Sequence, residues 1–239
     1  MLFRSDQIHG LRYVKAIRDR GCEVIVACSG ALAMIVRQVE GVKAIVQHEA
    51  AFGIVHDAWV PSMSAVPILG WEYEDVDGSA YIPTPSTPHN KKYRIGLRWQ
   101  GNPQFEHEQH RLFPSHLLFD AVKDLDVEFV SLQRDEGAQH RPHWVKQVPL
   151  NSWEETQAAV SACDMVISSC TSVAHLSAAM GVETWIVVPI LPYYLWAKPG
   201  NSTPWYNNTK LFRQEVFGDW THPFQSIKTQ LKHKLTKAA

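Results

Sequence analysis

Residues 165–181 read MVISSCTSVAHLSAAMG, and this stretch decides the fold predicted for the chain. Its apolar start predicts a buried strand, and the small residues after Ser172 predict a helix that carries His175. Backbone N–H groups at a helix start lack partners within the helix, and the helix dipole adds partial positive charge there. Because Thr171 and Ser172 add hydroxyl donors, the turn at Cys170–Ser172 predicts a phosphate or pyrophosphate site. The structural alternative is that a hydroxyl merely caps the helix and His175 is a partly buried histidine.

Strands and helices alternate around this stretch. Strands are expected over 93–99, 127–132, 165–168 and 184–188, with helices over 115–123, 153–162 and 172–180. This alternation gives a parallel sheet with helices on both faces. Ligands of such sheets bind beyond the carboxyl ends of the strands, where we expect Arg98, Gln133, Arg134 and the turn to meet.

The chain before residue 83 shows a shorter alternation. Ile8, Leu11, Val14 and Ile17 recur at helical spacing, so one helix is expected from Ser5 to Gly21. A strand over 23–30, a further helix and a strand over 43–47 follow. Residues 83–92, PTPSTPHNKK, contain three prolines and predict a linker. The sequence therefore predicts two domains, 1–88 and 89–239.

Composition excludes several classes of protein. The chain has 239 residues, 45% of them hydrophobic and 20% charged, with a formal net charge of −1. No overall field therefore favours nucleic acid or an anionic membrane. The N-terminus lacks the apolar core of a signal peptide, and the longest apolar run, 185–197, is short and contains two prolines. We expect a cytoplasmic protein without a transmembrane segment.

Motif searches leave the phosphate site without a standard fingerprint. The sequence contains no GxGxxG, no GxxxxGK[ST] and no GxSxG, and its four cysteines form no CxxC pair. EHEQH at 106–110 is one residue too short for HExxH, so no metal site is expected. Arg98, Arg111 and Arg134 are each able to neutralise phosphate charge, although any one of them is more typical of a solvated surface arginine.

Several motifs occur together in one order. They are GLRWQGNP at 96–103, Arg111, FVSLQRD at 129–135, the stretch already quoted, WIVVP at 185–189 and STPWYNNTKLFRQ at 202–214. This set resembles the glycosyltransferases of the heptosyltransferase superfamily, especially members associated with tetratricopeptide repeats. The resemblance covers nearly all of residues 94–215.

The resemblance implies an α/β fold of the GT-B type, with two Rossmann-like domains whose parallel sheets face a cleft. Residues 1–88 would be a reduced acceptor-side domain, and residues 89–239 would bind the nucleotide sugar. The final helix, expected over 223–235, would pack back on the N-terminal domain. The implied activity is inverting transfer of a sugar from a nucleoside diphosphate sugar to an acceptor hydroxyl, without metal or cofactor. Helix-start amides and arginines would then stabilise the departing diphosphate.

The resemblance also assigns roles to residues. Asp6 is the candidate base for the acceptor hydroxyl, with helix capping as its structural alternative, and His175 is the second catalytic candidate. The donor diphosphate is assigned to Cys170, Thr171, Ser172, Arg98, Arg111 and Arg134. The nucleotide or sugar pocket is assigned to Gln133, Glu155 and Thr156. Trp205 is added to this pocket from the residues alone, because it belongs to an aromatic cluster over 192–206 that is able to stack on a sugar or base, with a packed loop as the favoured structural alternative.

Three departures from the family pattern support an alternative function. Cys170 stands where the family commonly has an aspartate, the glycine-rich loop before Asp6 is reduced to MLFR, and the N-terminal half is short. The alternative is a nucleotide-sugar-binding or scaffold protein that has lost turnover. A two-domain hydrolase or phosphatase is the least favoured interpretation. The sequence leaves open the nucleotide base, the sugar, the oligomeric state and the acceptor, whether a glycan, a protein or a modified nucleic-acid hydroxyl.

Overall fold

The computed structural model describes residues 4–86, 92–105 and 107–238, so part of the expected linker lies outside the described residues. The C-terminal half contains a six-stranded sheet in the order β5-β4-β3-β6-β7-β8, in which every pair is parallel. The strands are β3 (Arg94–Arg98), β4 (Glu128–Ser131), β5 (Lys146–Gln147), β6 (Met165–Ser169), β7 (Glu183–Val188) and β8 (Thr209–Arg213). The chain starts in the middle of this sheet at β3, runs outward to β5, and returns to the other side of β3 at β6. β3 and β6 therefore flank the point where the strand order reverses, which is where such sheets bind ligands.

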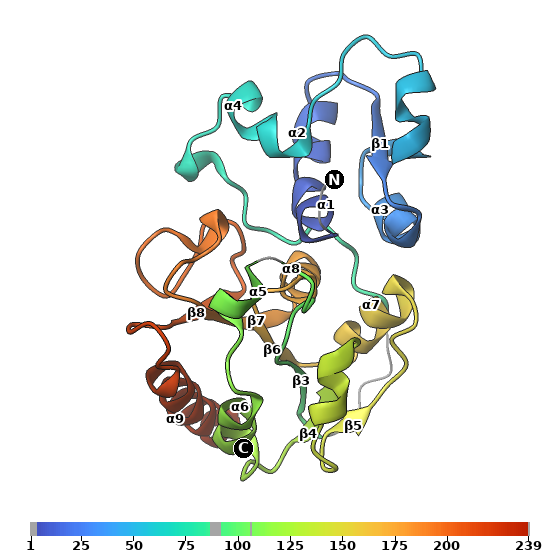
Figure 1. The fold of residues 1–239 in the computed structure, drawn as a ribbon. Coiled ribbons are helices and arrows are strands. Elements are labelled where there is room, and N and C mark those ends of the chain that lie inside the picture. The colour runs from blue at the N-terminus through green and yellow to red at the C-terminus, as the bar shows by residue number, and fades with distance from the viewer. Residues whose placement is uncertain (1–3, 87–91, 106, 239) are drawn as a thin grey trace.

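Helices cover both faces of this sheet (Figure 1). One face carries α6 (Ser115–Val122) and α9 (Thr221–Ala238), around a core that includes Trp99, Phe113, Trp185 and Phe224. The other face carries α7 (Trp153–Ser161) and α8 (Ser172–Ala179). β6 and β7 are buried almost throughout, which explains why their sequences are continuous apolar runs rather than alternating ones.

The N-terminal half is smaller. It contains α1 (Arg4–Gly10), α2 (Tyr13–Arg18), β1 (Val24–Cys28), α3 (Ala33–Arg37), β2 (Val42–Gln47) and α4 (Ala65–Leu69), with β1 and β2 paired in parallel. Short 3-10 helices occupy 30–32, 48–53, 62–64 and 73–75 here, and 136–140 and 194–196 in the other half; α5 (Glu108–Arg111) is a single turn. One hydrophobic cluster joins the halves, since Ile8 and Leu32 belong to the same core as Leu176 and Trp196.

The expected single helix over 5–21 is wrong, because the chain forms two helices that change direction at Leu11 and Arg12. The N–H groups of these two residues bond three residues back, to Ile8 and His9, which tightens the chain into a turn. Gly10 lies so close to the 62–64 segment that an added Cβ would be 2.6 Å from the Ser62 Cβ. This close approach requires glycine, and it fixes α1 against that segment.

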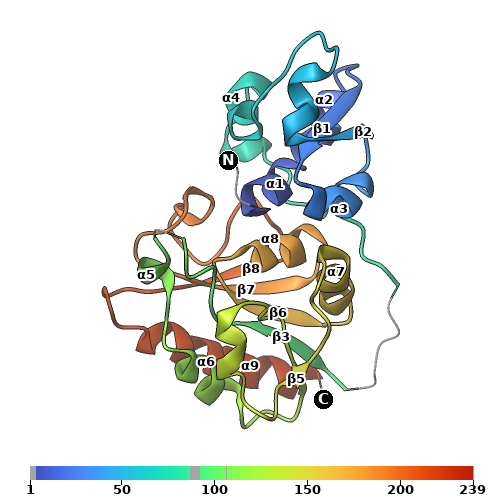
Figure 2. The ribbon, with the colours of Figure 1, turned by 45° about the vertical axis from the view of Figure 1, so that its right-hand side comes forward.

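The final helix also differs from expectation. α9 packs against α6 and β8, on the opposite side of the sheet from the N-terminal half (Figure 2). Its apolar residues Phe224, Ile227 and Leu231 are fully buried in that core, which commits this face of the helix to the C-terminal sheet. The expected packing of residues 223–235 on the N-terminal domain is therefore not what the structure shows.

Candidate functional site

The turn between β6 and α8 lies at the reversal point of the sheet. Thr171 is the N-cap residue, with extended backbone angles of φ −138° and ψ 172°, and its side chain makes no capping hydrogen bond. Its hydroxyl lies instead 3.2 Å from the Ser168 hydroxyl. The structural alternative therefore holds only in part: Thr171 makes no side-chain cap, so its hydroxyl leaves the first amides of α8 unused, whereas His175 is buried as that alternative expects. Cys170 and Thr171 are buried, whereas Ser172 is half-buried and is the part of the turn that solvent reaches.

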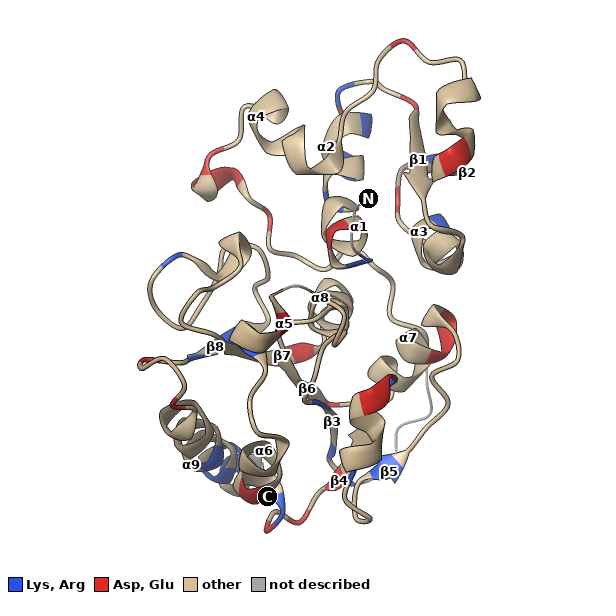
Figure 3. Ribbon diagram, in the orientation of Figure 1, with Lys and Arg blue, Asp and Glu red and all other residues tan. Residues whose placement is uncertain are grey.

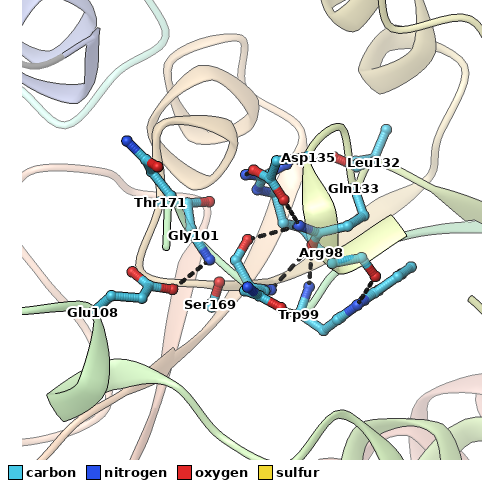
Figure 4. A network of polar contacts seen from close by, with 12 residues as sticks. Arg98, Trp99, Gly101, Glu108, Leu132, Gln133, Asp135, Ser169 and Thr171 are labelled. Carbon is cyan, nitrogen blue, oxygen red and sulfur yellow. Dashed lines mark hydrogen bonds and ion pairs between the residues drawn. The ribbon is translucent and has the colours of Figure 1, made fainter. Parts of the chain in front are cut away.

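Arg111 is the arginine that reaches this turn. Its Nη1 donates to the carbonyl of Cys170 at 2.5 Å, and its Nε pairs with Glu108 at 2.5 Å. The other oxygen of the Glu108 carboxylate accepts from the backbone N–H of Gly101 at 2.7 Å (Figure 4). α5 thus places a cation beside the helix start and anchors it to the loop after β3. Sequence reasoning missed Glu108, although its spacing of three residues from Arg111 is the signal for such a pair.

Arg98 lies at the end of β3 and is 6% exposed. It donates to Asp135 at 2.7 Å and to the carbonyl of Leu132 at 3.1 Å. Burial lowers the pKa of Arg98, and the neighbouring Asp135 opposes that change. Arg98 therefore forms an ion pair with Asp135. Asp135 is the last residue of the FVSLQRD motif, and it was not predicted as a site residue.

Gln133 holds the ends of β3 and β4 together. Its side-chain oxygen accepts from the N–H groups of Trp99, at 3.2 Å, and Gln100, at 3.0 Å, while its amide nitrogen donates to Asp135 (Figure 4). The residue is 3% exposed. Beyond this network a hollow of about 300 Å³ opens beside Trp99 and Gln100, bounded by residues 112–115 and His140.

Arg134 and Glu155 both bond to the backbone of Asn151, which precedes α7. Arg134 is exposed and donates to the carbonyl of Asn151 at 3.0 Å, while the Glu155 carboxylate accepts from the Asn151 N–H at 2.5 Å. Thr156 donates to the carbonyl of Ser152 at 2.9 Å. Glu155 and Thr156 thus organise the start of α7, and their contacts are local.

α1 of the N-terminal half faces the same side of the sheet. Asp6 is 9% exposed, and Tyr193 donates to its Oδ1 at 2.7 Å. One turn further on, the His9 ring lies 6.3 Å from the His175 ring. The structure therefore brings the two catalytic candidates, Asp6 and His175, to one interface between the halves.

His175 is enclosed in aromatic rings. It is 2% exposed, its Nδ1 lies 2.9 Å from the Tyr206 hydroxyl, and its ring stacks on Trp196 at 5.2 Å. Burial lowers the pKa of His175 to about 3, with further contributions from Arg12 and Arg111. The imidazole is therefore neutral at neutral pH, and it supplies no positive charge to a phosphate there.

Arg12 connects the N-terminal half to the C-terminal half, and the sequence analysis did not predict this role. It is 7% exposed and donates to the carbonyl of Trp205 at 2.7 Å, with its guanidinium 4.6 Å from the centre of the Tyr206 ring. Trp205 is 4% exposed and lies 5.0 Å from the His9 ring. Trp205 is thus packed between the halves.

Cys170 is a buried thiol rather than an acid. Burial raises the pKa of Cys170, and the indole N–H of Trp196 donates to its sulfur at 3.0 Å. Among the residues that the structure describes, no group of three or more His, Cys, Asp and Glu side chains is arranged to hold a metal ion. No helix within the described residues is long and apolar enough to cross a membrane.

Comparison with known proteins identifies the fold. No family model and no curated protein matches the chain. Among solved structures, E. coli ADP-heptose LPS heptosyltransferase II matches with a TM-score of 0.64 and 10% identity, over 100% of this chain and 98% of that one. E. coli heptosyltransferase WaaC with ADP matches with a TM-score of 0.59 and 12% identity, over 100% and 97%. The dodecameric iron-containing heptosyltransferase TibC, in complex with ADP-D-beta-D-heptose, matches with a TM-score of 0.58 and 12% identity, over 96% and 73%.

Proposed function

We propose that this chain, which has the GT-B fold of the heptosyltransferases, is an inverting, metal-independent glycosyltransferase. It would move a sugar from a nucleoside diphosphate sugar to an acceptor hydroxyl, with no cofactor besides that donor. The observation that carries the proposal is the meeting of the α8 turn, Arg111 and α1 at the reversal point of the sheet. Similar structures bind ADP and ADP-heptose.

The donor side of the proposed site is in residues 89–239. As the bond from the sugar to the diphosphate breaks, negative charge develops on the phosphate oxygens. The α8 amides at Ser172 and the guanidinium of Arg111 are placed to stabilise that charge, with the Thr171 hydroxyl beside them. Arg98 and Arg134 enter the proposal as outer groups, because their observed partners are Asp135 and Asn151. Gln133 would shape the wall on which the nucleotide rests, together with the hollow beside Gln100.

The acceptor side is in residues 1–88. Asp6 would accept the proton of the acceptor hydroxyl while its oxygen bonds to the sugar carbon and the nucleoside diphosphate leaves from the opposite face. The hydrogen bond from Tyr193 holds the orientation of the Asp6 carboxylate. His175 would act as a neutral group that positions Tyr206 behind the phosphate turn.

A second candidate function is binding of a nucleotide sugar without turnover. Two observations favour it: Cys170 offers a neutral thiol where an acid is common, and Asp6 and His175 are both less than a tenth exposed. A site that keeps its phosphate turn and loses access to its base binds a donor and does not transfer its sugar.

Calorimetry with ADP, UDP and GDP, followed by an assay for released nucleoside diphosphate with candidate acceptors, separates the two functions. For the transferase, Asp6→Asn should lower turnover about 10²- to 10⁴-fold with unchanged nucleotide affinity, because only the proton transfer is affected. Asp19→Asn, at an exposed carboxylate after α2, is the matched control and should change neither. Addition of EDTA should leave turnover unchanged.

The other outcomes are equally informative. Normal turnover of Asp6→Asn would remove Asp6 as the base. Nucleotide binding without release for any acceptor would favour the binding protein, and loss of turnover on chelation would contradict metal independence. Failure to bind any of the nucleotides would reject both functions.

A further inference from the structure

A tyrosine of the chain already makes the hydrogen bond that the proposed acceptor needs. Tyr193 follows β7, in the loop before the 3-10 helix at 194–196, and its hydroxyl donates to Asp6 Oδ1 at 2.7 Å. A general base must lie within hydrogen-bond distance of the proton that it removes, and 2.7 Å is within that range. The Tyr193 hydroxyl therefore lies where the proposed mechanism requires an acceptor hydroxyl.

The loop that carries Tyr193 is attached to the proposed phosphate turn. β6 and β7 are neighbours in the sheet, so the turn after β6 and the loop after β7 leave the same edge about 5 Å apart. The Trp196 indole N–H donates to Cys170 Sγ at 3.0 Å, and the Tyr193 ring lies 6.4 Å from the His175 ring in α8. Tyr193 thus lies beside the elements proposed to hold the departing diphosphate.

Asp6 is the carboxylate that these elements provide for Tyr193. α1 contains one acidic residue, Asp6, while α8 and residues 189–197 contain no Asp or Glu. In Figure 3 one stretch of α1 is accordingly red and α8 is tan. Among these three segments, only Asp6 is able to take a proton from the phenol as a carboxylate base.

The environment of Tyr193 keeps its phenol protonated. Burial raises the pKa of Tyr193 above its ordinary value of about 10, and the hydrogen bond to Asp6 raises it further. A free phenolate is therefore absent at neutral pH. Attack by this oxygen requires that Asp6 take the proton as the new bond forms.

Exposure also favours an acceptor that belongs to the chain. Tyr193 is half-buried, and its neighbours Leu191 and Tyr194 are 67% and 37% exposed, so a donor is able to approach the loop from solvent. Asp6, in contrast, is 9% exposed. A free acceptor would have to displace Tyr193 to reach Asp6 Oδ1, whereas the phenol is already bonded to it.

We propose that Tyr193 is a self-glycosylation site, to which the chain transfers the sugar of a nucleoside diphosphate sugar. This inference rests on the proposed function and names its acceptor, a phenolic hydroxyl of the protein itself. In this step the Tyr193 oxygen bonds to the anomeric carbon of the sugar, and its proton passes to Asp6, which later releases it to solvent. The bond from the anomeric carbon to the diphosphate oxygen breaks, and its electron pair leaves with the nucleoside diphosphate. The product carries one sugar linked through oxygen to Tyr193.

The test is mass spectrometry of the full chain after incubation with ADP-heptose, ADP-glucose, UDP-glucose or GDP-mannose, without an added acceptor. At least one donor should add a single sugar to the chain and release an equal amount of nucleoside diphosphate. Fragmentation of peptides from the parent chain should place that sugar on Tyr193, a result that depends on no variant.

Variants separate the acceptor from the base. Tyr193→Phe keeps the ring and should abolish the addition while nucleotide binding remains. Asp6→Asn should slow the addition about 10²- to 10⁴-fold. Tyr73→Phe, at a tyrosine that is 44% exposed, is the matched control and should gain the sugar as the parent does.

Three results would overturn the inference and leave the proposed function intact. They are nucleotide binding without added mass for any donor, addition at a residue other than Tyr193, and undiminished addition in Tyr193→Phe. Faster transfer to a free acceptor by Tyr193→Phe, with no sugar on the parent, would show that Tyr193 blocks the base instead. Failure to bind ADP, UDP and GDP would reject the proposed function and this inference with it.

Discussion

At the scale of single residues, the structure gives His175 a different chemistry from the one its position suggests. Its sequence place, three residues into the helix after the phosphate turn, is compatible with a charged imidazole that faces an anion. Aromatic rings surround it instead and hold it neutral. His9 lies beside it with its pKa also lowered well below the usual value, again mainly by burial.

The pKa values predict acid sensitivity. Below pH 6.5 the unfolded chain protonates His175, whereas the folded chain does so only near pH 3. The contribution of neutral His175 to stability is therefore fully present above pH 6.5. As the pH falls from 6.5 towards 3, protonation of this histidine in the unfolded chain should lower the free energy of unfolding by about 1.4 kcal/mol per pH unit. Urea unfolding at pH 7.5 and 5.5 measures the slope. His175→Gln should reduce the slope, while His143→Gln, at an exposed histidine, should retain it; an equal slope in the parent and His175→Gln would contradict the assignment.

At the scale of elements, the predicted strands and the helices before residue 181 form in the C-terminal half where their sequence patterns place them, whereas α5, β5 and β8 were not predicted. β3, β4, β6, β7, α6, α7 and α8 are all confirmed to within two residues. Long apolar runs specify buried parallel strands whatever their neighbours do. The helix expected over 5–21 breaks at Leu11 and Arg12, next to Gly10, which lies against Ser62, a residue far away in the sequence.

The α8 turn allows an element-scale test of anion binding. Ser172 is the first residue of the helix, and proline is well tolerated there because its missing N–H has no partner within the helix. Thr171 already has the extended conformation that a following proline requires. Ser172→Pro should therefore keep the fold and weaken nucleoside diphosphate binding about tenfold or more, through loss of one hydrogen bond to a charged group. Ser172→Ala retains the amide and serves as the control in calorimetry; equal affinity of the two variants would exclude that N–H from the site.

At the scale of the whole molecule, the two halves are held together by a buried arginine and aromatic rings. Arg12 lies at the break between α1 and α2, and its guanidinium donates to the carbonyl of Trp205, a residue nearly two hundred positions later in the sequence. Gln157 of α7 adds a polar link, because its amide bonds to Gln38 at 2.8 Å and to the carbonyl of Pro83 at 2.9 Å. The same interface brings α1, which carries Asp6, against α8.

Removal of the Arg12 guanidinium should lower the free energy of unfolding of the chain. Arg12→Met leaves the Trp205 carbonyl without its donor and removes the charge from the ring of Tyr206, so we expect a loss of about 3 kcal/mol in the free energy of unfolding. Arg12→Lys keeps the charge without the planar fork and should lose less. Urea unfolding followed by tryptophan fluorescence measures both. A surface substitution, Arg37→Met on α3, should change stability by less than about 0.5 kcal/mol. An Arg12→Met variant as stable as that control would contradict the role given to Arg12.

The sequence by itself determined the strands β3, β4, β6 and β7, the helices α6, α7 and α8, and the position of the α8 turn. Those features depend on local periodicity and on backbone groups at a helix start, which the order of residues dictates. Only the tertiary structure decided the break in the first helix, the packing of α9 against α6, and the partners of Arg12, Arg98 and His175. Such contacts join residues tens to hundreds of positions apart, and burial, which sets the charge of His175, exists only once the halves have packed together.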